Sequence, residues 1–173
     1  MVKPRSPSHL SPADRLLRKP ERIVGIGFRC SIACLRGCAV DEQQHACAVL
    51  RASVEIQLLP LTLIGAFSAW ALAVESSAIR PVAVLPTDSL GFCRDECLAI
   101  SLVAACQNNA CPALRACAFA LLGGGDVGRT LSATQAVADA LREADTLLTP
   151  DAVAEVAGFL SATSAAGSSR RVH

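Results

Sequence analysis

A short apolar segment with two glycines and a terminal arginine constrains the fold more than any other part of the chain. Residues 22–29 read Arg-Ile-Val-Gly-Ile-Gly-Phe-Arg. The β-branched residues predict a short buried strand, and Gly25 and Gly27 allow another backbone or a ligand to approach closely. Arg29 follows the predicted strand end, which is where ligands of open α/β sheets bind. The alternative is a core strand whose glycines serve packing and whose arginine forms a surface salt bridge.

A second buried strand is predicted over Pro-Val-Ala-Val-Leu, residues 81–85. It leads into a turn in which Thr87 and Asp88 offer a hydroxyl and a carboxylate at the strand end. Helices are predicted at 95–106 and 112–122, from a capping-box pattern at 132–135, and from residue 149 onward. Together these elements predict an α/β fold: one small domain at 21–160 with a short, mostly parallel sheet flanked by helices. Residues 1–20 are predicted to be a disordered basic leader and 161–173 a disordered tail.

Composition narrows the class of protein. Of 173 residues 52% are hydrophobic, so a sizeable core can form. The formal net charge of +1 argues against a nucleic-acid partner held by bulk charge. Nine cysteines without an apolar signal-peptide region favour free thiols in the reducing cytoplasm.

Cysteines at residues 30, 34 and 38 recur every four residues, which places them on one face of a helix. With His45 and Cys47 following, one interpretation is a thiolate metal site. The other is that cysteine acts as a small hydrophobe on a buried stripe. The spacing fits zinc templates poorly, so we predict no metal and no cofactor. A small cysteine-rich metal-binding or redox protein stays as an alternative function.

Residues 58–74 form the most apolar run, with seventeen residues and no charge. A membrane span needs about 20 apolar residues, and this run contains Pro60 and Gly65. We therefore expect a strand or a buried helix in a core, and membrane association is not expected. A single-span membrane protein is the alternative.

The stretch Val24-Gly25-Ile26-Gly27-Phe28-Arg29 resembles the start of the CobE family of cobalamin-biosynthesis proteins, which is similar to the C-terminal domain of CbiG. Two later stretches, 80–90 and 112–125, are compatible with that family. The resemblance implies an α/β domain that binds or helps to process a precorrin, a tetrapyrrole with many carboxylates. It also implies other cobalamin-pathway enzymes as partners.

On this resemblance we predict that a ligand contacts two short segments and name no catalytic residue. In the first segment, Arg29 and the backbone amides near the glycines would hold carboxylates. The predicted ligand-binding residues are Gly25, Gly27, Phe28, Arg29, Thr87 and Asp88.

Overall fold

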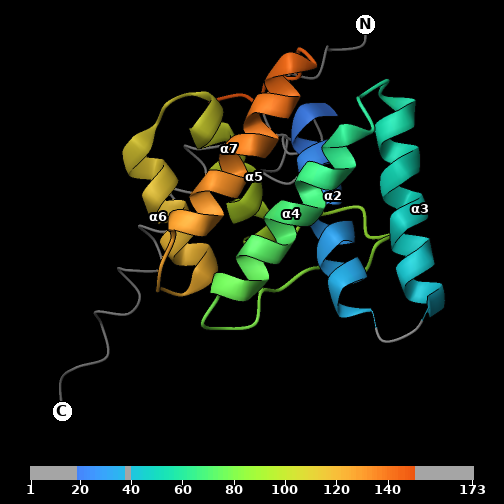
Figure 1. Ribbon diagram of the computed structural model, residues 1–173, viewed down its shortest axis with the longest axis horizontal. Helices are drawn as coiled ribbons and strands as arrows, with labels where there is room; N and C mark the ends of the chain where they lie inside the picture. The colour runs from blue at the N-terminus through green and yellow to red at the C-terminus, as the bar shows by residue number, and fades with distance from the viewer. Residues whose placement is uncertain (1–18, 38–39, 151–173) are drawn as a thin grey trace, which may run out of the picture.

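The structure is a computed structural model that describes residues 19–37 and 40–150, and these residues form a bundle of helices (Figure 1). Six α-helices and no strand occur in this part of the chain. Their bounds are α2 Lys19–Arg36, α3 Val40–Ile56, α4 Thr62–Ser77, α5 Arg94–Gln107, α6 Cys111–Leu122 and α7 Gly128–Glu143.

The predicted α/β fold with a parallel sheet is wrong. Residues 22–29, predicted as the first strand, lie inside α2, and residues 81–85, predicted as the second, have no regular secondary structure. Nearly every position from Ile23 to Ile32 is buried, so the run has no polar face that would reveal its period. A short, continuously apolar run does not distinguish a buried strand from a buried helix.

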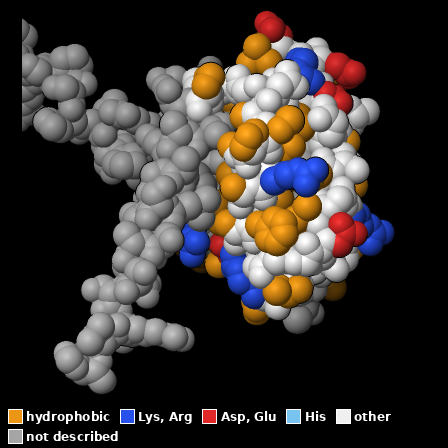
Figure 2. Space-filling view, turned by 90° about the vertical axis from the view of Figure 1, so that its left-hand side faces the viewer, with side chains coloured by type: hydrophobic (Ala, Val, Ile, Leu, Met, Phe, Trp, Pro, Cys, Tyr) orange, Lys and Arg blue, Asp and Glu red, His pale blue; other side chains and the backbone are white. Residues whose placement is uncertain are grey.

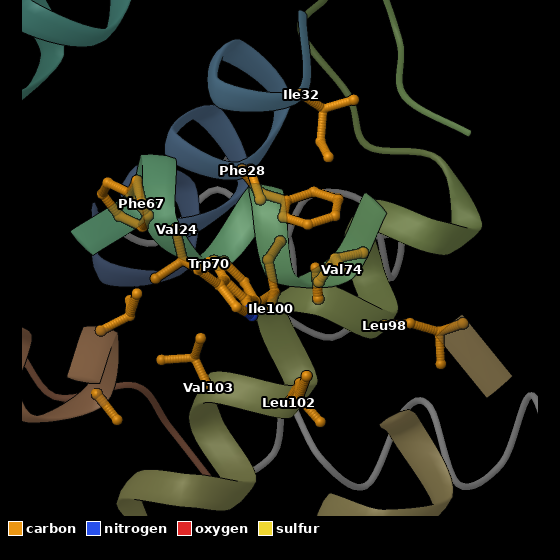
Figure 3. Packing of buried hydrophobic residues seen from close by; sticks show 14 of the residues in the cluster. Val24, Phe28, Ile32, Phe67, Trp70, Val74, Leu98, Ile100, Leu102 and Val103 are labelled. Atoms are coloured by element: carbon orange, nitrogen blue, oxygen red, sulfur yellow. The ribbon is translucent and has the colours of Figure 1, made fainter. Parts of the chain in front are cut away.

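The buried core draws side chains from all six described helices, and Figure 3 shows the part of it formed by α2, α4 and α5. α2 and α4 contribute side chains three or four residues apart, namely Val24, Phe28 and Ile32 from α2 and Phe67, Trp70 and Val74 from α4, whereas α5 contributes Leu98, Ile100, Leu102 and Val103 from more than one face. The rings of Phe28 and Trp70 are tilted, with their centroids 4.9 Å apart. Helix α5 is buried on most sides, because eleven of its fourteen residues are inaccessible.

Several predicted helices are confirmed. α5 begins with Asp95 and Glu96 in its first turn, where carboxylates complement the helix dipole. α6 has a proline at its start and ends at Gly123, whose φ of 78° suits glycine. α7 begins at Gly128, four residues before the predicted capping box.

The predicted domain boundaries are only partly covered by the structure. Lys19 and Pro20, assigned to the leader, begin α2. The rest of the leader, the helix predicted beyond residue 150 and the C-terminal tail lie outside the described residues.

The apolar run at 58–74 enters α4, which packs its buried face in the core, as the buried-helix interpretation expected. α3 lies at one edge of the bundle (Figure 1). It buries only three of its seventeen residues, Ala46, Leu50 and Val54. α3 is therefore less firmly anchored by apolar burial than α5.

The outer side of α6 is largely apolar. Phe119 is 54% exposed there, and Arg115 is the only charged residue in the helix. Figure 2 shows the side of the molecule on which α6 lies, with hydrophobic side chains gathered around basic ones.

Candidate functional site

Arg29, the cation of the predicted site, lies within α2 and is 1% exposed. Its Nε donates to Glu96 Oε1 at 2.6 Å and its Nη2 to Glu96 Oε2 at 3.1 Å. Its Nη1 and Nη2 also donate to the backbone carbonyls of Ser89 and Gly91, and the Phe92 ring lies 5.1 Å from its Cζ. The guanidinium is thus engaged on all sides by protein groups.

The glycines do permit close approach, but the approaching groups are aromatic rings of the same chain. A Cβ on Gly25 would lie 2.3 Å from the Phe92 ring, and one on Gly27 would lie 2.6 Å from the Phe67 ring. Phe28 is fully buried in the core. The glycines therefore serve packing, as the alternative for the sequence expected. That alternative was wrong in two respects, because the segment is a helix and the salt bridge of Arg29 is buried instead of at the surface.

Two buried carboxylates at the start of α5 hold the segment 78–93, which joins α4 to α5 and is named here the connecting segment. Asp95 accepts from both terminal nitrogens of Arg80, at 2.7 and 2.8 Å, and from the Ala83 N–H at 2.8 Å. Glu96 accepts from two further backbone N–H groups of the same segment. Burial alone would raise the pKa of Asp95, but the hydrogen bonds from Arg80 and Ala83 outweigh it and lower that pKa.

The connecting segment brings Thr87 to a surface pocket of about 310 Å³. The pocket lies between the end of α2, the start of α3 and this segment, and it is lined by Ala33, Arg36, Gly37, Glu42, His45, Pro86 and Thr87. Thr87 Oγ1 donates to the exposed Asp88 at 3.2 Å. The predicted residues are thus divided, because Thr87 and Asp88 are at the surface while Arg29 and its neighbours lie in the interior.

Two thiols, one on α2 and one on α3, lie in contact where these helices pack together. The Sγ atoms of Cys34 and Cys47 lie 3.0 Å apart, and both cysteines are free. Cys47 is exposed and Cys34 is half-buried. Burial, and then the hydrogen bond with Cys47, raises the pKa of Cys34 to about 12, so Cys34 holds its proton at neutral pH. Since a disulfide measures about 2.05 Å, an approach of about 1 Å would link the two sulfur atoms.

The sequence placed Cys34 on one helix face with Cys30 and Cys38. For Cys30 and Cys34, which both lie in α2, this is confirmed, whereas Cys38 lies outside the described residues. Cys30 is buried and its pKa is raised to about 11, chiefly by that burial. The partnership of Cys34 with Cys47 was missed, because it depends on how α2 packs against α3. No group of three or more metal-ligating side chains occurs in the residues that the structure describes.

Comparisons of the chain with protein-family models, curated proteins and solved structures find no match. They neither support nor oppose the resemblance to the CobE family. Among the helices of the described residues, none combines the length and apolar content that crossing a bilayer requires.

Proposed function

We propose that this protein is a thiol–disulfide redox responder in which Cys34 and Cys47 form a reversible disulfide between α2 and α3. The observation that carries the proposal is the 3.0 Å separation of their sulfur atoms. Cys47 is exposed, so a small oxidant can reach one member of the pair. The reducing cytoplasm expected from the sequence would keep the pair as thiols until an oxidant appears.

The reaction requires a low-molecular-weight disulfide as oxidant. The thiolate of Cys47 attacks one sulfur of that disulfide, forms a mixed disulfide and releases one small thiolate, which takes up a proton. The sulfur of Cys34, after losing its proton, then attacks Cys47 and releases the second small thiolate. Two protein thiols lose two electrons and two protons, and the oxidant becomes two thiols.

The electrostatics favour a responder over a catalyst. Catalytic dithiols rely on a thiolate whose pKa is lowered by a helix N-terminus or a cation. Here burial and the neighbouring thiols of Cys47 and Cys30 raise the pKa of Cys34, and no cation of the described residues opposes them. Burial, the largest cause, persists after Cys47 has entered the mixed disulfide, so Cys34 stays mostly protonated at neutral pH and the rate of its attack should rise with pH.

Other functions considered for the sequence have less support. Binding of a precorrin stays a prediction, and the guanidinium of Arg29, its main expected anchor, is occupied by Glu96 and two backbone carbonyls. For a structural zinc site the Cys34–Cys47 pair supplies two thiols, whereas such sites use four ligands.

The proposal is tested by mapping thiols after oxidation. The reduced protein is treated with oxidised glutathione, quenched with acid, alkylated and digested with trypsin. We expect a linked pair of peptides, 30–36 and 37–51, in which fragmentation places the bond between Cys34 and Cys47. The variant Cys47→Ser should lose this pair, whereas Cys111→Ser, which removes an exposed thiol on α6, should keep it. Cross-links scattered among several cysteines at equal yield would overturn the proposal.

A further inference from the structure

We propose that the surface pocket between α2, α3 and the connecting segment binds a small organic cation, an alkylammonium compound, through the carboxylate of Glu42. This goes beyond the redox function, because neither thiol of the Cys34–Cys47 pair lines the pocket. Its volume of about 310 Å³ is at the small end of the range for ligand sites, roughly 300–1,000 Å³. Since a water molecule takes up about 30 Å³ in the liquid, the pocket has room for a ligand of roughly ten non-hydrogen atoms or fewer.

The charges around the pocket favour a cation. Arg36 is the only arginine or lysine among the residues that line the pocket. It forms a two-pronged salt bridge to Glu75 with N–O distances of 2.6 and 3.0 Å. Glu42 receives no hydrogen bond or ion pair from the described residues. The exposed Asp88 adds negative potential beside the pocket.

Helix dipoles do not reverse this balance. The C-terminal end of α2, partially negative, and the N-terminal end of α3, partially positive, both border the pocket. Their effective charges, about half a unit each, are opposite in sign and largely cancel. The carboxylate of Glu42 therefore sets the sign of the potential, and a carboxylate ligand would be repelled.

The polar groups and apolar walls match an ammonium on a methylene chain. Thr87 donates its hydroxyl hydrogen to Asp88, so its oxygen retains lone pairs that can accept from an ammonium. Glu42 can accept a second N–H. Ala33 and Pro86 supply apolar surface for the methylene groups.

The test is an NMR titration of the reduced, full-length protein with 1,4-diaminobutane, following the backbone amides of Glu42 and Thr87. Succinate, which has the same number of carbons and opposite charge, is the ligand control. Glu42→Gln is the test variant and Asp41→Asn is the matched control, because both acids lie in the first turn of α3 and only Glu42 lines the pocket.

We expect saturable shifts at millimolar diamine and none with succinate. Glu42→Gln should raise the dissociation constant about three- to fivefold, the upper part of the range for one exposed charge pair, and Asp41→Asn should change it less than twofold. No saturation by the diamine, equal binding of succinate, or equal loss in the two variants would overturn the proposal. The outcome is independent of disulfide mapping, so the two proposals can fail separately.

Discussion

Oxidation of the Cys34–Cys47 pair should make α3 harder to detach from the rest of the protein. This is the largest structural consequence expected of the proposed chemistry. α3 is attached through three buried side chains, so its detachment in the reduced protein requires less free energy than opening of α5. A disulfide from α2 to α3 would restrict the detached state, in which only the chain connections at the two ends of α3 otherwise limit its movement.

The size of the effect follows from the loop that the disulfide closes, residues 34–47. For a loop of about 14 residues, the lost chain entropy is worth about 3 kcal/mol at 25 °C. The equilibrium constant for detachment of α3 should therefore be about 150 times smaller in the oxidised protein. Geometric strain is small in this estimate because the sulfur atoms already lie 3.0 Å apart.

Hydrogen–deuterium exchange with mass spectrometry measures this directly. Peptides covering Val40–Ile56 are compared in the reduced and the glutathione-oxidised protein, and exchange of the oxidised form should be about 150-fold slower. Cys47→Ser under the same oxidant should exchange like the reduced protein. If α3 exchanges at the same rate in both redox states while the linked peptides are present, the reasoning about its anchorage is wrong.

Three further predictions concern the groups that build the fold. Glu96→Gln leaves the buried Arg29 without its counter-charge and should lower the free energy of unfolding in urea by about 3–5 kcal/mol. Folding lowers the pKa of Asp95, so its ionised carboxylate stabilises the fold at pH values above the ordinary pKa of 3.8, and this contribution is lost as the pH falls through the pKa of the folded protein. In urea unfolding, the difference in free energy between wild type and Asp95→Asn should therefore be constant above about pH 5 and shrink below about pH 4. Gly27→Ala forces a methyl group against the buried ring of Phe67 and should lower the free energy of unfolding in urea by about 1–3 kcal/mol. Gly65→Ala places its methyl group in open space on α4 and should raise that free energy by about 0.5–1 kcal/mol. An equal loss of stability in the two variants would contradict the packing assigned to both glycines.

Local signals in the sequence predicted the helices of the second half of the chain. Acidic residues in the first turn of α5, and a proline at the start of α6 followed by a glycine at its end, act within single turns of backbone and are visible without tertiary structure. The first helix was missed because its central turns are buried almost all round, which removes the periodicity that separates helix from strand.

The candidate site was predictable only in fragments. The requirement for close approach at Gly25 and Gly27 was correct, but the sequence could not reveal that Phe92 and Phe67 are the approaching groups. Arg29 finds Glu96 sixty-seven residues away, and such a partner depends on helix packing. The Cys34–Cys47 pair has the same origin, since only the packing of α3 on α2 brings these two thiols together.

The central claim, a reversible disulfide between Cys34 and Cys47, is tested most directly by a redox titration. The protein is equilibrated in glutathione buffers of varying composition, and the fraction of the linked peptides is measured after acid quenching. The account predicts one transition that follows the square of the reduced glutathione concentration divided by the oxidised concentration, with loss of two thiols. A transition that follows the first power of that concentration, with glutathione remaining on Cys47, would contradict it.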